Sequence, residues 1–269
     1  MKLFWYPALA VSMFIFSCKN TDNQKINSTN QNKTVQQSEP ETIKIDSIRV
    51  SDSTAVSKTL TLVYGQKVLL LSGISKPILD SLYKQEAYEG KMPLAQYSKE
   101  SVRDAIKKQM QKYFEDSKIE SKEYMPVHKQ TWDRVSEMNV HSNANDFLTV
   151  RYDGYGYTGG AHGYAYQQYK TVDTKNQKLI KLTDIVDISK VNWNDVILKN
   201  MSSEYRDLLF EPKKIMANEN FFFDQQGITF VYGQYEIAPY AAGIIPAKVP
   251  YTAIYAALRP DFKKRLGIN

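Results

Sequence analysis

Hydrophobic and polar residues divide the chain into three zones with different patterns. Residues 3–16 are predominantly apolar and follow the single basic residue Lys2. From Lys19 to Pro40 the chain is polar: 14 of 22 residues are Asn, Gln, Ser or Thr, and none is aromatic. From Thr59 onward, short apolar patterns with strand and helix spacing follow one another. The pattern therefore predicts a hydrophobic leader, a polar spacer and a folded body.

The first two zones differ in how much apolar surface they can bury. The leader is shorter than the roughly 20 apolar residues that a membrane-spanning helix needs, and its length suits the apolar core of a secretory signal. The polar zone cannot bury enough apolar surface to offset the entropy lost on ordering, so residues 18–58 are predicted to form a disordered tether. An ordered edge strand is the alternative only from Thr42 to Val50, where apolar residues alternate with polar ones.

The first half of the folded body reads as strands followed by amphipathic helices. Alternation and short apolar runs predict strands at 60–64 and 68–71, and Ser75 with Pro77 predicts a helix start. A longer helix is expected from Lys99 to Asp116, because its apolar residues share one face. Lysines on the opposite face are interpreted as a solvated surface. Further strands are predicted at 131–140 and 147–157.

The second half shows a hairpin, a capped helix and a return to strands. The hairpin is predicted from 166–172 and 178–182, and Asn192 is expected to cap a helix whose apolar stripe continues to Leu209. Strands follow at 221–223 and 228–232. Helices grouped between antiparallel strands indicate an α+β fold, as two small packed halves with antiparallel sheets and amphipathic helices.

Overall composition narrows the function classes without naming one. Hydrophobic residues make up 42% and charged residues 24%, as in ordinary soluble domains. The net charge of +6 is mild for a dedicated nucleic-acid binder, so no nucleic-acid partner is expected. One cysteine excludes an internal disulfide and a cysteine-rich zinc site, and three histidines offer little for other metals. No metal and no cofactor is therefore expected.

The position of the single cysteine suggests a membrane anchor. Residues Ile15-Phe16-Ser17-Cys18 resemble a bacterial lipobox, in which the cysteine receives lipid after cleavage before it. The resemblance implies a signal peptide over 1–17, lipidated Cys18 and an extracytoplasmic protein of the cell envelope. Lys19 rather than Asp at the second mature position favours the outer membrane in a cell with two membranes. A plain signal peptide that happens to contain a cysteine is the alternative.

Two segments resemble a known family. Tyr157-Thr158-Gly159-Gly160-Ala161-His162-Gly163 and Tyr235-Glu236-Ile237-Ala238-Pro239-Tyr240-Ala241-Ala242-Gly243 are similar to the signature segments of the extracytoplasmic RsiV-type domain. Residues 172–179 resemble that family's hairpin and 249–251 its closing strand. The usual companion of this domain is the N-terminal domain found in the deacetylase PdaC. The resemblance, which is strongest after Tyr152, implies a PdaC-type domain over 59–150 and an RsiV-type domain over 151–265.

The resemblance also implies a function class. RsiV is an anti-sigma factor whose outer domain binds lysozyme, and PdaC carries a separate catalytic domain. The chain shows neither a sigma-binding segment nor room after these domains for a catalytic one, so neither role is expected to transfer. What the resemblance implies is a non-catalytic binding module at the cell surface. Its partner would be a lysozyme-like protein or peptidoglycan, with the membrane reached through the lipid.

Within the two segments, several residues are candidates for ligand contact. Tyrosine offers a large contact area with little rotamer entropy, although packing on one sheet face is the competing interpretation. His162 fits a structural or binding role better than a catalytic one. Glu236, flanked by apolar residues, is expected to be partly buried and paired with a cation such as Arg. Tyr235 and Tyr240 are expected to rim a groove together with Tyr157. The full candidate set is Tyr155, Tyr157, Gly159, Gly160, His162, Tyr235, Glu236 and Tyr240.

Catalytic motifs give little support to an enzyme. The sequence contains no G-x-S-x-G, no H-E-x-x-H and no phosphate-binding G-x-x-x-x-G-K pattern, so a non-enzymatic protein is expected. Two alternatives stay open. One is an extracytoplasmic hydrolase or deacetylase-type enzyme using His162 and Glu236, and the other is a structural envelope protein without a discrete ligand.

Overall fold

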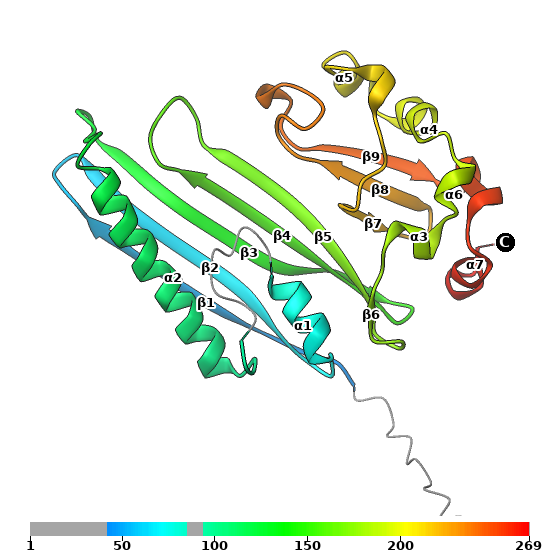
Figure 1. The fold of residues 1–269 in the computed structure, drawn as a ribbon, viewed down its shortest axis with the longest axis horizontal. Helices are drawn as coiled ribbons and strands as arrows, with labels where there is room; N and C mark the ends of the chain where they lie inside the picture. The colour runs from blue at the N-terminus through cyan, green and yellow to red at the C-terminus, as the bar shows by residue number, and fades with distance from the viewer. Residues whose placement is uncertain (1–41, 85–93, 269) are drawn as a thin grey trace, which may run out of the picture. The chain divides into compact units, whose positions relative to one another are not determined.

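A computed structural model describes residues 42–84 and 94–268, which belong to one compact unit from Pro40 to Asn269. They form two β-sheets with several helices, so the α+β prediction is confirmed (Figure 1). The leader, Cys18 and the tether as far as residue 41 lie outside the described residues. Among the helices of residues 42–84 and 94–268, none is long and apolar enough to cross a membrane.

The first sheet has six strands in the order β1-β2-β3-β4-β5-β6. Its elements, in chain order, are β1 (Lys44–Ala55), β2 (Leu60–Ser72), α1 (Lys76–Tyr83), α2 (Lys99–Glu120), β3 (Gln130–Ala144), β4 (Phe147–Tyr157), β5 (Tyr164–Asp173) and β6 (Lys178–Leu179).

Strand β1 shows that the predicted tether is too long. Residues 44–55 pair antiparallel with β2 along the whole strand, which agrees with the edge-strand alternative and extends it. Ile48 is the one core residue of β1, at 3% exposed. The strand reads as polar because an edge strand presents most of its side chains to solvent, and charged residues there discourage pairing with other chains. The two strands predicted over 60–71 are one continuous strand, β2.

Helix α2 forms as its pattern predicts and ends at Glu120, four residues beyond the expected end. The Ser98 hydroxyl accepts a hydrogen bond from the Ser101 N–H and caps the helix. Val102, Ile106 and Tyr113 are buried, on a face that packs against β1 and β2. The amphipathic helix therefore covers part of one sheet face, as expected.

The predicted domain boundary at residue 150 is wrong in structural terms, because it cuts through β4. Strand β4 pairs with β3 on one side and β5 on the other, so residues through Leu179 belong to the first sheet. The sheet is also not wholly antiparallel, since β2 and β3 are parallel. A parallel pair needs a long crossover, and the segment containing α1 and α2 supplies it.

The rest of the chain builds a smaller, antiparallel sheet in the order β7-β8-β9. Its elements are α3 (Leu182–Ile185), η1 (Ile188–Lys190), α4 (Trp193–Asn200), α5 (Ser203–Arg206), η2 (Pro212–Lys214), β7 (Phe221–Phe223), β8 (Gly227–Tyr232), η3 (Tyr240–Ala242), β9 (Ile245–Pro250), α6 (Tyr251–Ile254), η4 (Tyr255–Ala257) and α7 (Pro260–Leu266), where η marks a 3-10 helix. Asn192 caps α4 as predicted, by accepting from the Asp195 N–H. The helix ends at Asn200 instead of continuing to Leu209, because Met201 adopts an extended conformation.

Each sheet has its own hydrophobic core. The first includes Leu62, Ile106 and Tyr152, and the second includes Ile197 and Phe230. Asn220 joins the two parts: its side-chain oxygen accepts from the Tyr169 N–H at 2.9 Å, and its amide nitrogen donates to the Gln167 carbonyl at 2.9 Å. The Asn220 side chain thus pairs with backbone groups of β5 that a neighbouring strand would otherwise bond, and it holds the small sheet beside β5.

Candidate functional site

Two connecting loops, far apart in the sequence, meet at one end of β5. The first joins β4 to β5 and contains His162, and the second joins β8 to β9 and contains Tyr235 and Tyr240. The backbone N–H of Ala165 donates to the side-chain oxygen of Gln234 at 2.8 Å, which holds the loops together. The fold therefore brings together the two segments that the sequence singled out.

His162, Tyr235 and Tyr240 form a compact group, called the aromatic cluster below. The His162 ring stacks on the Tyr240 ring at a centroid distance of 3.9 Å and an angle of 24°. Tyr235 lies 5.8 Å from Tyr240, and its hydroxyl is 3.4 Å from His162 Nε2. Tyr235 is 58% exposed, so the cluster presents aromatic surface to solvent. Rings held in mutual contact lose little further entropy when a partner binds.

Local backbone geometry places these side chains. Tyr235 has a left-handed backbone, with φ of 64°, a conformation that costs a non-glycine residue free energy and is often found at functional positions. Pro239 precedes the short helix η3, and Gly243 with φ of 68° ends it. On the other loop, His162 Nδ1 lies 2.9 Å from the Gly163 carbonyl, which orients the ring.

Glu236 does not have the environment expected from its neighbours. The residue is exposed, and its carboxylate accepts hydrogen bonds from the Gly233 N–H at 2.7 Å and the Asn218 amide at 3.1 Å. The apolar neighbours Ile237 and Ala238 turn inward while Glu236 folds back on its own turn, so burial and an Arg partner were wrong expectations. No hydrogen bond joins Glu236 to His162, both of which lie in the described chain.

The remaining candidates shape the first loop and do not join the cluster. The Tyr157 hydroxyl donates to the Gly160 carbonyl at 3.1 Å across its own loop, in place of the predicted groove with Tyr235 and Tyr240. Gly159 and Gly160 have φ of 93° and 88°, a region that favours glycine. Tyr155 is 41% exposed, and its hydroxyl lies against Gly163. A Cβ added at Gly163 would lie only 2.5 Å from that hydroxyl oxygen.

Glycines in β4 allow close approach of rings, as their strand context predicts. A Cβ at Gly154 would lie 2.1 Å from the Tyr166 ring, and a Cβ at Gly156 would lie 2.7 Å from the Tyr164 ring. Both tyrosines come from β5, directly opposite these glycines in the register. Part of the tyrosine-rich segment therefore packs on the sheet, which is the competing interpretation raised above.

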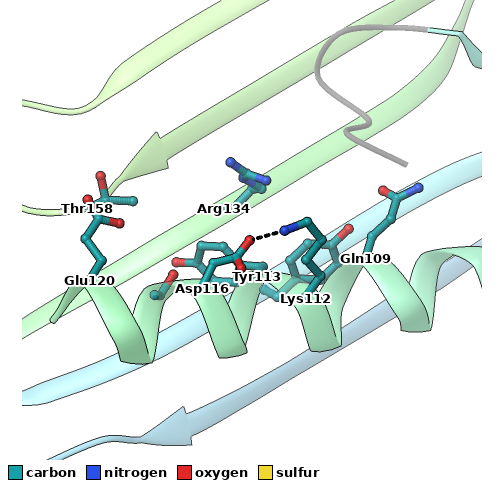
Figure 2. Close-up of a pocket in the computed structure, with 9 residues that line it drawn as sticks. Gln109, Lys112, Tyr113, Asp116, Glu120, Arg134 and Thr158 are labelled. Carbon is teal, nitrogen blue, oxygen red and sulfur yellow. Dashed lines mark hydrogen bonds and ion pairs between the residues drawn. The ribbon is translucent and has the colours of Figure 1, made fainter. Parts of the chain in front are cut away.

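Sequence reasoning missed a concave surface beside α2. One hollow of about 220 Å³ is lined by Gln109, Lys112, Tyr113, Asp116, Glu120 and Arg134 (Figure 2). An adjoining hollow of about 230 Å³ is lined by Tyr124, Pro126, Gln130 and Trp132. Glu120 and Thr158 line both hollows, so the hollows are continuous with each other. We call the two hollows together the α2 groove. The helical spacing of Lys112, Asp116 and Glu120 is a signal that could have indicated a charged face next to the sheet.

The described residues offer no obvious place for a metal. Across 42–84 and 94–268, no group of three or more His, Cys, Asp or Glu side chains lies close enough together to hold an ion.

Comparison with known families divides the chain into two matched segments. Residues 10–165 match a family described as deacetylase PdaC, and residues 172–252 match a family described as a protein of unknown function (DUF3298). The PdaC-type domain implied by the resemblance is confirmed, but its match ends at residue 165 and therefore includes the Tyr157–Gly163 segment, which the resemblance had assigned to the C-terminal domain. The segment containing His162 lies in the first match and the segment containing Tyr235 and Tyr240 in the second, so the aromatic cluster draws on both.

Solved structures show the same fold at low sequence identity. A DUF3298 family member from Bacteroides fragilis superposes with a TM-score of 0.62 and 21% identity, covering 83% of this chain and 97% of that one. A DUF3298 family protein from Pseudomonas aeruginosa gives 0.53 and 14%, covering 81% and 96%. No curated protein matches the chain.

Proposed function

Since the chain belongs to the family described as deacetylase PdaC, we propose that it is an extracytoplasmic binding protein whose partner is a lysozyme-like protein. The proposal assigns partner contact to the aromatic cluster and no chemistry to any residue. It follows the RsiV-type resemblance of the Tyr157–Gly163 and Tyr235–Gly243 segments, whose best-known relative binds lysozyme.

The proposal includes a place in the cell. The apolar leader is removed before Cys18, and lipid on that cysteine holds the protein at the envelope, on the outer membrane where a cell has two. The polar residues after Cys18 let the folded body stand away from the lipid surface. A partner secreted by another cell would meet the protein there.

The stack of His162 on Tyr240, with Tyr235 exposed beside it, is the observation that carries the proposal. Tyrosine and histidine rings fixed by neighbours suit a protein interface, where aromatic residues in packed positions contribute much of the binding free energy. The hydrogen bonds of His162 and Glu236 hold their loops, and neither side chain is oriented by the other. This arrangement favours a binding role over catalysis.

A calorimetric titration of the full-length protein, in mild detergent, with a c-type lysozyme tests the proposal. We expect saturable binding, and we expect Tyr235→Ala and Tyr240→Ala each to weaken it by about tenfold or more. Tyr255→Ala is the matched control, because Tyr255 is exposed but belongs to η4, outside the cluster.

Other outcomes would point to the other functions. No binding of lysozyme overturns the proposal, and binding of peptidoglycan fragments alone, sensitive to Tyr240→Ala, would replace the protein partner with wall glycan. Release of acetate from an N-acetylated glycan, abolished in His162→Ala, would make the protein an enzyme. The absence of every one of these activities would favour a structural role in the envelope.

A further inference from the structure

The α2 groove is a cavity whose lining residues are all different from those of the aromatic cluster. Its two hollows together fall within the roughly 300–1,000 Å³ typical of small-molecule sites. Helix α2 forms one wall, and strand β3 contributes Trp132 and Arg134. In Figure 2, Gln109 lies at one end of the first hollow, and Glu120 with Thr158 at the other, where the second hollow begins.

Charge in the groove is balanced. Lys112 and Arg134 carry positive charge, and Asp116 and Glu120 carry negative charge; Lys112 forms an ion pair with Asp116 at 2.6 Å. The Arg134 guanidinium lies 5.3 Å from the centre of the Tyr113 ring, over its face. An anion would meet two carboxylates and a cation would meet two basic groups, so the groove suits a ligand that is polar but uncharged.

Two buried polar groups in the wall lack a hydrogen-bond partner within the described residues. They are the hydroxyl of Tyr113 and the side-chain amide nitrogen of Gln109. Tyr113 is 5% exposed, and burial raises the pKa of its hydroxyl to about 12, so it stays protonated and can donate. Since buried donors are nearly always paired, two unpaired donors at one cavity point to a ligand rich in acceptors.

The second hollow adds an apolar, aromatic surface. Tyr124 is 73% exposed and stands beside Pro126, which also lines the hollow. Trp132, 2% exposed, donates its ring N–H to Gln130, so its contribution to the hollow is its ring. Gly159 packs against the Trp132 ring, and a Cβ added at Gly159 would lie 3.3 Å from it. This close approach keeps the loop at the edge of the hollow.

We infer that the α2 groove is a binding site for a neutral saccharide chain. A pyranose ring has an apolar face of C–H groups, which suits Tyr124 and Pro126, and a rim of hydroxyls, which suits Glu120, Gln109 and Tyr113. The charge balance selects against nucleotides and phosphate. The site goes beyond the proposed function, since it uses a different surface and a different class of ligand.

Titration of the full-length protein with chitotetraose, a neutral N-acetylated saccharide, tests the inference. We expect saturable binding by calorimetry and a change in tryptophan emission that persists in Trp193→Phe and disappears in Trp132→Phe. Tyr124→Ala, which alters an exposed ring, should weaken binding by about tenfold. Glu120→Gln should weaken it about three- to tenfold, since a hydrogen bond to a charged group becomes a neutral one.

The controls separate this site from the aromatic cluster. Tyr255→Ala and Tyr235→Ala should both leave saccharide affinity unchanged, and Tyr124→Ala should leave lysozyme binding unchanged. The inference is overturned by the absence of binding at millimolar saccharide, or by wild-type affinity in Tyr124→Ala. It is also overturned if inorganic phosphate competes with the saccharide, because the groove would then be an anion site.

Discussion

Arg265 of α7 forms a bidentate ion pair with Asp173, the last residue of β5. Its Nη1 donates to Oδ2 and its Nη2 to Oδ1, the latter at 2.9 Å, while the Asp173 side chain is 3% exposed. The guanidinium also donates to the carbonyls of Asn145 and Asp146, and it lies 3.9 Å from the centre of the Phe147 ring. A residue near the C-terminus therefore ties the second core to the end of the first sheet.

Removing Arg265 should destabilise the protein strongly. Arg265→Ala leaves the buried Asp173 carboxylate without its cation, a change that typically costs about 3–5 kcal/mol. Urea unfolding followed by circular dichroism measures the loss. Arg259→Ala is the control, since its exposed side chain donates one hydrogen bond to the Thr183 carbonyl. Equal losses in the two variants would show that the ion pair has no special role.

The same ion pair should make stability fall in acid. Burial raises the pKa of Asp173, but hydrogen bonds from Arg265 and Asn176 outweigh it and lower the pKa below its ordinary value. The folded carboxylate then binds a proton less readily than the unfolded one, whose pKa is about 3.9. Its contribution is thus fully present above that pH and is lost as pH falls through the lowered folded pKa.

Unfolding free energies of wild type and Asp173→Asn, measured between neutral pH and about pH 2, check this dependence. We expect the difference between the two proteins to shrink as the solution is acidified. A difference that stays constant across the range would contradict the assignment of the pKa shift to this pair.

Gly163→Ala should distort the loop that carries His162. A Cβ there would lie 2.5 Å from the Tyr155 hydroxyl and 2.7 Å from the Gly156 carbonyl oxygen, and the backbone atom cannot rotate away. We expect a destabilisation of about 1–3 kcal/mol together with weaker partner binding. Gly233→Ala is a gentler comparison in the facing loop, because its Cβ would meet only the Glu236 carboxylate at 3.7 Å. Thermal unfolding of the two variants should therefore differ clearly.

Two substitutions of Tyr235 separate the effect of its backbone conformation on stability from the effect of its ring on binding. Its left-handed backbone costs a residue with a side chain roughly 1–2 kcal/mol, a cost that glycine avoids. Tyr235→Gly should therefore unfold at a higher temperature than Tyr235→Ala, although both variants lose the aromatic ring and are expected to lose the proposed partner binding equally. If the alanine variant were the more stable, the φ of 64° would not be a strained conformation in solution.

Local features of the fold could be predicted from neighbouring residues. The start of α1 after Ser75, the cap of α4 by Asn192 and the bounds of β4 depend on short-range patterns and appear as expected. The β1 strand was underestimated because its polar residues carry little hydrophobic signal, and its stability comes from backbone pairing with β2. A sequence pattern records side-chain polarity and does not record which backbone groups are paired.

Relationships across the fold were beyond local reasoning. The resemblance singled out the two segments that contain His162 and Tyr240, but it did not predict that the two rings stack. Glu236 was expected to be buried because its neighbours are apolar, whereas its carboxylate accepts a hydrogen bond from the Gly233 N–H of its own turn. The α2 groove forms because Trp132, Tyr124 and the loop containing Gly159 and Gly160 line the same hollow. Only the arrangement of the strands in the sheet brings these residues together. Nothing in the spacing of these residues along the chain indicates that contact.

The parallel pairing of β2 with β3 has a kinetic consequence. Leu60 pairs with Gln130 across the whole crossover that contains α1 and α2, whereas β3, β4 and β5 pair through short turns. Closing such a long loop loses chain entropy before any contact compensates, and folding slows as the sequence separation of contacts grows. The β3–β4–β5 meander can therefore assemble early, with β1 and β2 docking late. Until β1 and β2 dock, the edge of β3 that pairs with β2 in the folded protein stays exposed, so this is the period in which pairing with another chain is most favoured.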